Sequence, residues 1–324
     1  MSVTPKKLKK GDKVMIVAPA RGLKLIGADC RKIAEERLKS LGLSVVFANN
    51  TTDENFDMLG SACPEKRAAD INQAFADKSV KAVLTVIGGF NSNEILKYLD
   101  YDAIKENPKI FMGFSDITAL HAALYAKADL TTYYGPHYSS LGMLKGCEYT
   151  FDNAIKMLFE EGEKELLPSK EWSDDLWFLD QENREFNQNE GWWQIQKHNA
   201  EGTILGGNLC TFILQLGTPF RPKFEKDTIL FIEDDEMSNL ATFDRNLQAL
   251  INQEDFKNVK GLIIGRFQKG SKVTREGLEF ILKKIELKNM PIIANVDIGH
   301  TTPIATIPLG GYAHIEDGRI FIKD

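Results

Sequence analysis

A serine at position 115 has the sequence context of a catalytic nucleophile. Ser115 follows the apolar run 109–112 and Gly113, and a helix-like stretch begins at Ile117. A serine on such a sharp strand-to-helix turn points its hydroxyl out of the sheet, and the N-terminal end of the helix favours developing negative charge. The hydrolase elbow has the pattern G-x-S-x-G, and here Ile117 stands where the second glycine would be. The alternative interpretation is that Ser115 only caps the helix.

A serine nucleophile also needs a base within hydrogen-bond reach and an acid that orients the base, and these usually come from distant positions. Of the five histidines, His300 is the best candidate for the base, because it lies in a Gly-His-Thr turn after the apolar run 292–296. His137, in the segment Tyr-Gly-Pro-His, is a candidate pocket residue. Glu233 is the candidate acid, since it ends the apolar run 228–232, where an unpaired carboxylate would be costly.

Glu233 also opens an acidic run, 233–236, which allows two other interpretations. The carboxylates could favour the positive end of the following helix, with Ser238 as its cap. They could also bind a metal ion, but no histidine stands nearby at the spacing of a ligand. We therefore expect no metal site and no cofactor.

The double-glycine turn Gly88-Gly89 precedes a further helix-like segment and offers backbone N–H groups as donors. Such donors could bind a phosphate, but the turn lacks both the pattern G-x-G-x-x-G and the lysine of a P-loop. They would serve equally well as an oxyanion hole, which stabilises the negative charge on an attacked carbonyl oxygen. Asn91, beside this turn, is a candidate helix cap and a candidate substrate contact.

The segments around these residues alternate between strand-like and helix-like patterns in the first part of the chain. We expect strands at 13–18, 44–48, 81–87 and 109–112, and helices at 28–41, 64–76, 93–99 and 117–125. This alternation predicts a parallel, doubly wound sheet whose ligands collect at the carboxyl ends of the strands. After a polar stretch with four tryptophans, we expect a helix at 209–216, strands at 228–232, 261–264 and 291–296, and short strands between 306 and 323.

These patterns predict an α/β protein with two domains and a connector. The N-terminal domain, residues 1–165, would be a doubly wound, mostly parallel sheet that carries Ser115. Residues 166–200 would form the connector, with a tryptophan-rich loop, and residues 201–324 would form a mixed α/β domain that carries the candidate acid and base.

Composition favours a soluble globular protein that acts on a small molecule or a peptide. The chain has 324 residues and a net charge of −6, and it has no basic patch with interleaved aromatic residues, so no nucleic-acid partner is expected. No apolar run approaches the roughly 20 residues that span a bilayer, and the N-terminus lacks the features of a signal peptide. We therefore expect a cytoplasmic protein with no membrane partner. The four cysteines lie far apart, which predicts neither a zinc site nor a disulfide framework.

Six short motifs in register resemble the LD-carboxypeptidase family of serine peptidases. They are Gly88–Asn93, Gly113–Leu120, Tyr134–Pro136, Gly206–Leu209, the strand-end Glu233 and Asp297–Thr301, within a likeness that covers roughly residues 10–315. The resemblance implies that Ser115 is the nucleophile, His300 the base and Glu233 the acid, with the backbone N–H groups of Gly89 and Asp116 as the oxyanion hole. It also implies a homodimer and an active site in the cleft between the two domains. The missing elbow glycine is the family's own pattern.

Two branches of this family fit the chain. One removes a terminal D-amino acid from muropeptides in cell-wall recycling, and the other, the microcin C immunity peptidases, cleaves the amide between an amino acid and a modified nucleotide. The run Tyr134–Tyr138 and the loop 172–193 resemble the second, MccF-like branch. The rings of Trp172, Trp177 and Trp192 could stack on a nucleobase. The alternative is that these tryptophans only attach the connector to the core.

Two other classes of function are compatible with the fold. A non-catalytic binding protein would be expected to have lost a member of the triad, and none is missing. An amidotransferase-like enzyme would need a cysteine at the elbow, where this chain has Ser115. The sequence therefore predicts a serine-dependent amide hydrolase of the MccF-like branch, acting on an aminoacyl-nucleotide, with the muropeptide carboxypeptidase, acting on a small peptide, as the alternative.

Overall fold

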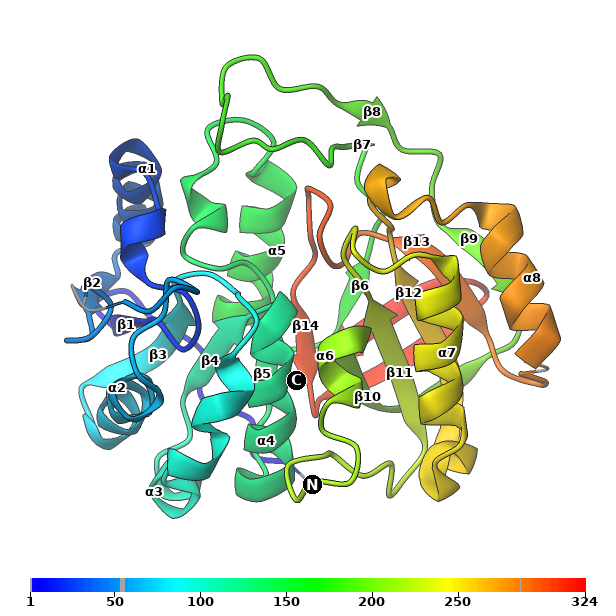
Figure 1. Cartoon of the computed structure of the whole chain (residues 1–324), viewed down its shortest axis with the longest axis horizontal. Coiled ribbons are helices and arrows are strands. Elements are labelled where there is room, and N and C mark those ends of the chain that lie inside the picture. The colour runs from blue at the N-terminus through cyan, green and yellow to red at the C-terminus, as the bar shows by residue number, and fades with distance from the viewer. Residues whose placement is uncertain (1, 53–55, 286) are drawn as a thin grey trace.

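The chain folds into two β-sheets that lie side by side, with helices packed around them (Figure 1). The computed structural model describes residues 2–52, 56–285 and 287–324. The earlier part of the chain builds most of the first sheet, and the later part builds most of the second.

The first sheet has six strands, in the order β14-β5-β4-β3-β1-β2. Five of them are parallel: β1 (Lys13–Val17), β2 (Ser44–Phe47), β3 (Val80–Thr85), β4 (Ile110–Gly113) and β5 (Thr132–Tyr134). The sixth strand, β14 (Ile307–Leu309), comes from the end of the chain and pairs with β5 in the antiparallel direction. The sheet is therefore mostly parallel and is closed at one edge by a late segment of the chain.

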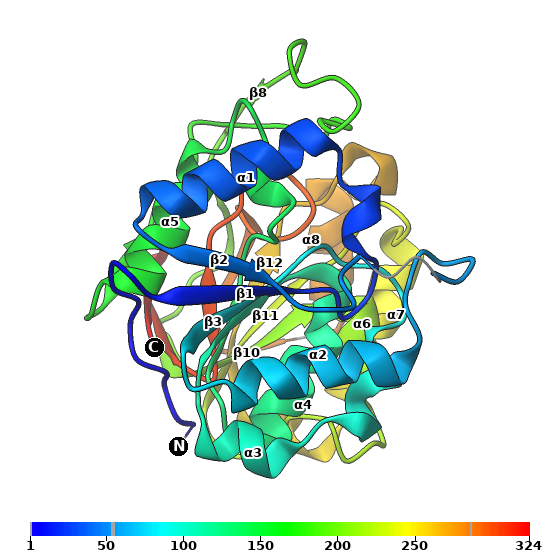
Figure 2. The ribbon, with the colours of Figure 1, turned by 90° about the vertical axis from the view of Figure 1, so that its left-hand side faces the viewer.

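Helices cover both faces of this sheet (Figure 2). They are α1 (Ala28–Ser40), α2 (Pro64–Ala76), α3 (Tyr101–Glu106), α4 (Thr118–Ala128) and α5 (Glu148–Phe159). Side chains alternate between the faces of a strand, so Val14 and Ile16 of β1 pack in one hydrophobic cluster with α1 and α5. Met15 and Val17 pack in a second cluster with α2, α3 and α4. This two-sided burial is what makes the strands almost continuously apolar.

The second sheet has eight strands, in the order β6-β16-β15-β10-β11-β12-β13-β9. Its four neighbouring parallel strands are β10 (Ala200–Asn208), β11 (Thr228–Glu233), β12 (Val259–Gly265) and β13 (Ile292–Val296). Antiparallel strands flank them: β6 (Lys164–Leu166), β9 (Trp193–Gln196), β15 (Tyr312–Glu316) and β16 (Arg319–Lys323).

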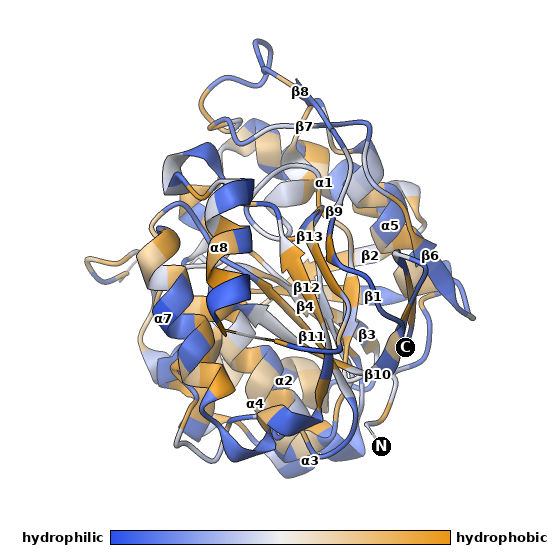
Figure 3. Cartoon of the chain, turned by 90° about the vertical axis from the view of Figure 1, so that its right-hand side faces the viewer, coloured by the Kyte–Doolittle hydropathy of each residue, from blue (hydrophilic) through white to orange (hydrophobic). Residues whose placement is uncertain are grey.

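One hydrophobic cluster joins the two sheets. Ile229 and Phe231 of β11 pack in the cluster that also contains Ile16 of β1, whereas Leu230 and Ile232 face the other way. That other face is covered by α6 (Leu209–Ile213), α7 (Leu240–Ile251) and α8 (Arg275–Ile285). Figure 3 shows the polar sides of α7 and α8 turned outward over the apolar strands.

The predicted architecture, a doubly wound, mostly parallel sheet followed by a mixed α/β unit, is confirmed. The expected helix at 93–99 is present as a 3₁₀ helix, Ser92–Tyr98, which ends where Leu99 is extended and the Asp100 side chain caps α3. The expected helix at 209–216 is α6, which ends at Ile213.

The two sheets exchange strands near the predicted domain boundaries. β6, at the end of the predicted N-terminal domain, belongs to the second sheet, and β14 belongs to the first. The boundaries at 165 and 200 stay predictions.

Most of the connector, residues 166–200, runs above both sheets and contains the short pair β7 (Glu171–Trp172) and β8 (Asn187–Gln188), while its last part includes β9 of the second sheet (Figure 1). Within the described ranges, no helix is long and apolar enough to cross a membrane. Across the same ranges, no three His, Cys, Asp or Glu side chains are placed to hold a metal ion.

Candidate active site

Ser115 lies on the sharp turn between β4 and α4 that its sequence context predicts. Its φ of 62° is in the left-handed region, where a residue other than glycine costs of order 1–3 kcal/mol. The 3₁₀ turn Ser115–Ile117 then continues into α4. Gly113 permits the approach to the neighbouring strand, because a Cβ at this position would lie 2.2 Å from Thr85 Oγ1. The backbone therefore holds Ser115 in a conformation that an ordinary loop would not keep.

The structure brings Ser115, His300 and Glu233 into one hydrogen-bonded series. His300 Nε2 lies 2.8 Å from Ser115 Oγ, and His300 Nδ1 lies 2.8 Å from Glu233 Oε2. Ser115 follows a strand of the first sheet, whereas Glu233 ends β11 and His300 follows β13 in the second sheet. The site thus lies where the two sheets meet, and the arrangement has the geometry of a nucleophile, a base and an orienting acid.

Glu233 is fully buried and accepts hydrogen bonds from three side chains. His300 bonds to Oε2, and both the Tyr134 hydroxyl (2.6 Å) and Asn208 Nδ2 (3.1 Å) donate to Oε1. Burial by itself raises the pKa of the Glu233 carboxyl, but His300 and these hydrogen bonds outweigh it and hold the pKa below its usual value. The carboxylate therefore stays ionised although it has no access to water.

His300 has the opposite balance. Burial lowers the pKa of the imidazole, and the Glu233 carboxylate outweighs this, so the pKa of His300 is raised above its usual value. The His300 side chain keeps 17% of its surface exposed, whereas the Glu233 side chain is fully buried. Gly299 lets the His300 loop come this close, since its φ is +107° and a Cβ there would lie 2.3 Å from Glu233 Oε2.

The Gly88-Gly89 turn runs directly beside the nucleophile. A Cβ on Gly88 would lie 3.2 Å from Ser115 Cβ, and one on Gly89 would lie 3.0 Å from Ala20 Cβ, so a larger residue at either position would crowd its neighbour. Within the described part of the chain, no hydrogen bond from the Gly89 N–H is found. A free backbone donor beside a serine hydroxyl can serve an oxyanion.

Asp116 ties the Gly88-Gly89 turn to the nucleophile turn. Its buried carboxylate accepts from the Ser92 N–H at 3.0 Å, and the Ser92 hydroxyl donates to the Asp116 carbonyl at 2.6 Å. The segment that follows Gly89 is thereby fixed to the residue after Ser115. The two N–H groups predicted to form an oxyanion hole, those of Gly89 and Asp116, lie on two turns that these bonds hold together.

Asn91 and His137, two predicted substrate contacts, lie buried behind these turns. Asn91 Oδ1 accepts from the Ser61 hydroxyl at 3.2 Å, and Arg67 Nη1 donates to the Asn91 carbonyl at 3.1 Å. His137 Nδ1 lies 2.6 Å from Thr85 Oγ1, and its ring packs on Phe114 at 4.4 Å. Burial, together with the nearby His300, lowers the pKa of His137 to about 3, so this imidazole is neutral.

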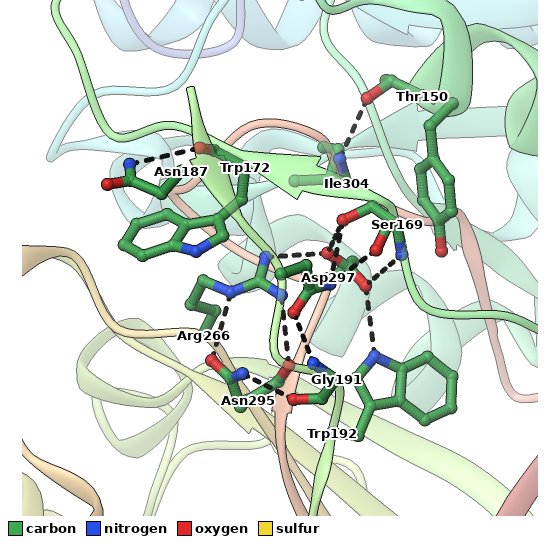
Figure 4. A network of polar contacts seen from close by, with 12 residues as sticks. Thr150, Ser169, Trp172, Asn187, Gly191, Trp192, Arg266, Asn295, Asp297 and Ile304 are labelled. Atoms are coloured by element: carbon green, nitrogen blue, oxygen red, sulfur yellow. Dashed lines mark hydrogen bonds and ion pairs between the residues drawn. The ribbon is translucent and has the colours of Figure 1, made fainter. Parts of the chain in front are cut away.

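Of the four tryptophans in the connector, three are predicted substrate contacts, and two of these, Trp172 and Trp192, lie beside a buried ion pair at the strand ends of the second sheet (Figure 4). Arg266 Nη1 and Asp297 Oδ1 are 2.7 Å apart, and the Trp192 indole N–H donates to Asp297 Oδ2 at 3.1 Å. The Trp172 ring lies 5.2 Å from the Arg266 guanidinium carbon. Trp177 packs edge-on against Phe178. Trp177 and Trp192 also pack against the hydrophobic cluster that joins the two sheets, so all three rings have partners in the fold.

Ser169 and Asn295 complete this cluster, which we call the Asp297 network. The Ser169 N–H and hydroxyl donate to Asp297 at 3.0 and 2.6 Å. Arg266 Nε donates to Asn295 Oδ1 at 3.1 Å, and Asn295 Nδ2 donates to the Gly191 carbonyl at 2.8 Å (Figure 4). The network therefore fastens both ends of the connector loop to the strand that leads to His300.

Sequence reasoning did not assign a role to Tyr134, Asn208 or Arg266. Tyr134 and Asn208 stood inside motifs that resemble the family, but nothing local showed that both side chains reach Glu233. Arg266 directly follows β12, and a lone arginine after an apolar strand carries no signal of its partner.

Family models match both halves of the chain. The model described as the LD-carboxypeptidase N-terminal domain matches residues 14–135, and the LD-carboxypeptidase C-terminal domain matches residues 201–315. The chain is 49% identical over 312 residues to the Bacillus subtilis protein YocD, named as a carboxypeptidase, and the match covers 96% of this chain and 95% of YocD.

Relatives with two different substrate names are about equally distant. The chain is 33% identical to the Escherichia coli microcin C7 self-immunity protein MccF, over 85% of this chain and 82% of MccF. It is 31% identical to a Bacillus subtilis protein named as a murein peptide carboxypeptidase, over 97% of this chain and 91% of the relative.

Solved structures match along almost the whole length. An MccF-like protein from Bacillus anthracis superposes with a TM-score of 0.96 at 46% identity, covering 99% of each chain. MccF in complex with glutamyl sulfamoyl guanosine superposes with a TM-score of 0.88 at 29% identity, covering 99% of this chain and 98% of MccF.

Proposed function

The chain belongs to the LD-carboxypeptidase family, and on that premise we propose that Ser115, His300 and Glu233 are the catalytic triad of a serine-dependent amide hydrolase. The observation that carries the proposal is the series from Ser115 Oγ through His300 to Glu233, with 2.8 Å at each step. The strained backbone at Ser115 supports it, because such strain collects at functional sites.

In the first half of the reaction, His300 Nε2 takes the proton of Ser115 while Oγ attacks the carbonyl carbon of the amide. The carbonyl oxygen becomes negative and accepts hydrogen bonds from the backbone N–H groups of Gly89 and Asp116. Glu233 stays ionised, because its partners hold the pKa low, and it stabilises the imidazolium. The amine then leaves with the proton from His300, and an ester on Ser115 remains.

In the second half, a water molecule gives a proton to His300 Nε2 and attacks the ester carbon. The same two N–H groups stabilise the second oxyanion. The intermediate collapses, Ser115 Oγ takes the proton back, and the acid product is released. Loss of one such oxyanion donor typically costs about 10²–10³ in rate.

We propose an amide between an amino acid and a modified nucleotide as the substrate. The support is the 46% identity to an MccF-like protein and the likeness to MccF bound to glutamyl sulfamoyl guanosine. The alternative is removal of a terminal D-amino acid from a muropeptide, supported by the murein peptide carboxypeptidase relative. The proposal includes a homodimer in the cytoplasm and no metal or cofactor.

Contacts of the substrate with Asn91, His137, Trp172, Trp177 and Trp192 stay predictions. All three tryptophans are half-buried and have partners in the fold: Trp172 and Trp192 contact Arg266 and Asp297, and Trp177 packs against Phe178 and the hydrophobic core.

The test is a parallel assay of the wild type and Ser115→Ala on two substrates, an aminoacyl sulfamoyl adenosine and a tetrapeptide that ends in D-alanine. We expect the wild type to cleave the first faster, and Ser115→Ala to lose about 10⁴-fold or more of kcat at an unchanged melting temperature. Cleavage of the tetrapeptide alone would assign the muropeptide reaction. Full activity in Ser115→Ala would end the triad assignment, and loss of activity with a chelator would point to a metal.

A further inference from the structure

The hydroxyl of Tyr134 connects the backbone of Ser115 to the carboxylate of Glu233. The Ser115 N–H donates to Tyr134 Oη at 3.0 Å, and the Tyr134 O–H donates to Glu233 Oε1 at 2.6 Å. With the bonds of His300 to Ser115 Oγ and to Glu233 Oε2, this makes a closed ring of four residues. In the proposed reaction, the proton moves between Ser115 and His300, on one side of the ring. On the other side, Tyr134 links the Ser115 backbone to Glu233.

The surroundings of Tyr134 determine the direction of both bonds. The side chain is buried, and its ring packs against Phe231 at 5.0 Å and His121 at 5.8 Å. Burial first, and then the charge of Glu233, raise the pKa of the Tyr134 hydroxyl well above its usual value, so the group keeps its proton. A hydroxyl can donate one hydrogen bond, and Glu233 accepts it. The hydroxyl oxygen is then left to accept a hydrogen bond from the Ser115 N–H.

The Ser115 amide needs this acceptor. Ser115 lies beyond the end of β4, so its half-buried N–H is outside the ladder, and a buried donor without a partner is costly. Tyr134 ends β5, the neighbour of β4 in the first sheet, so its hydroxyl reaches the turn from the side. Its acceptor, Glu233, belongs to the second sheet, so the same hydroxyl sets the position of one sheet against the other at the site.

We propose that Tyr134 is a positioning residue for the reaction. It holds the peptide of the nucleophile in its left-handed conformation, and it occupies Oε1 of Glu233 so that Oε2 faces His300 Nδ1. This inference rests on the proposed triad. Tyr134, which lies outside the triad, thus keeps the nucleophile of the first sheet and the acid of the second sheet at a fixed relative position.

The chain contains a matched control on the same strand. Tyr133 is also buried, points to the other face of β5, and donates its hydroxyl proton to the carboxylate of Asp324 at 2.5 Å. Tyr133→Phe and Tyr134→Phe therefore each remove one oxygen and one hydrogen bond to a carboxylate from neighbouring positions. Only the second change touches the site.

The experiment measures kcat, KM and their pH dependence for Tyr134→Phe and Tyr133→Phe, on whichever of the two amides the wild type cleaves, together with urea unfolding. Tyr134→Phe should lower kcat by about 10- to 100-fold, with KM changed less than threefold, as the loss of a hydrogen bond to a charged group predicts. Without the phenol, the charge of Glu233 is less compensated, which raises the pKa of His300 further. The acid limb of the kcat/KM profile should therefore move to higher pH.

Tyr133→Phe should destabilise the fold to a similar extent while its kcat and acid limb stay within twofold and 0.2 pH units of wild type, on the order of experimental error. The inference is overturned if Tyr134→Phe keeps the wild-type kcat and pH profile, or if both variants lose kcat in proportion to their stability. Those outcomes leave the triad standing as long as Ser115→Ala is inactive. Full activity in Ser115→Ala would overturn the triad, and with it this role of Tyr134.

Discussion

Two buried carboxylates of the second sheet, Glu233 and Asp297, have similar surroundings and different partners. Both are fully buried, both stand at the carboxyl ends of parallel strands, and each accepts hydrogen bonds from several side chains. The partner of Glu233 is His300, a titratable side chain that reaches the hydroxyl of Ser115. The partner of Asp297 is Arg266, a guanidinium that is 2% exposed and has only N–H donors (Figure 4).

The difference shows how a partner decides what a buried acid does. Next to a histidine, the carboxylate orients a base that can take and return a proton, so the pair can run chemistry. Next to an arginine, it closes a permanent ion pair that holds two segments of chain together. Glu233 therefore belongs to the proposed machinery, and the Asp297 network belongs to the fastening of the connector.

The largest effect that separates the two acids is expected from Glu233→Gln. An amide at this position would not stabilise the imidazolium and would favour the wrong tautomer of His300, so kcat should fall by about 10⁴-fold. Melting temperature should change little, because Tyr134 and Asn208 can still bond to the amide. Steady-state kinetics and thermal unfolding measure the two quantities. A loss of less than tenfold would remove Glu233 from the triad.

Asp297→Asn should show the reverse pattern. The change leaves the Arg266 guanidinium buried without a counter-charge, which should lower the free energy of unfolding by about 3–5 kcal/mol. The kcat of the folded fraction should fall less than tenfold. Urea unfolding measures the first effect, and kinetics at low temperature measure the second.

A double variant, Asp297→Asn with Arg266→Met, is the control for the charge. It should recover a substantial part of the lost stability, because no unpaired ion remains in the core. If Asp297→Asn instead loses kcat as strongly as Glu233→Gln while it stays folded, the contrast between the two acids is wrong.

The pH dependence of activity tests the role of His300, the titratable partner of Glu233. His300 must be neutral to accept the Ser115 proton, and its pKa is raised above the usual value by Glu233. Activity should therefore be low in acid and rise about tenfold per pH unit, up to an apparent pKa above about 6.5. A kcat/KM profile from pH 4 to 9 measures this limb. In Asp297→Asn the limb should stay in place, and a limb below pH 6 in the wild type would contradict the pairing.

Trp192→Phe gives the smallest expected effect. The change removes one of several hydrogen bonds to Asp297, so the free energy of unfolding should fall by about 1–2 kcal/mol while KM stays within twofold. Thermal unfolding and substrate titration measure the two, with Trp177→Phe as the comparison in the same loop. A tenfold rise in KM for Trp192→Phe would establish the stacking contact that the sequence suggested.

Much of the site could be predicted from local patterns. Strand-end positions pointed to Ser115, Glu233 and His300, because apolar runs of strand length mark where a parallel sheet ends and where its ligands collect. The same runs predicted the doubly wound sheet. Patterns of this kind cannot show that β14 crosses to the first sheet, since an isolated three-residue strand carries too little signal to choose its neighbour.

The sequence by itself determined which residues could react and the α/β architecture that carries them, because both follow from the types and spacing of neighbouring residues. The family resemblance implied that Glu233 partners His300, but only the tertiary structure showed that Asp297 pairs with Arg266 and that Tyr134 reaches Glu233. Glu233 and His300 are 67 positions apart, Asp297 and Arg266 are 31 apart, and Tyr134 reaches Glu233 across 99 positions. Such pairs are set by the packing of the two sheets around a shared core, and this long-range contact leaves no local trace in the chain.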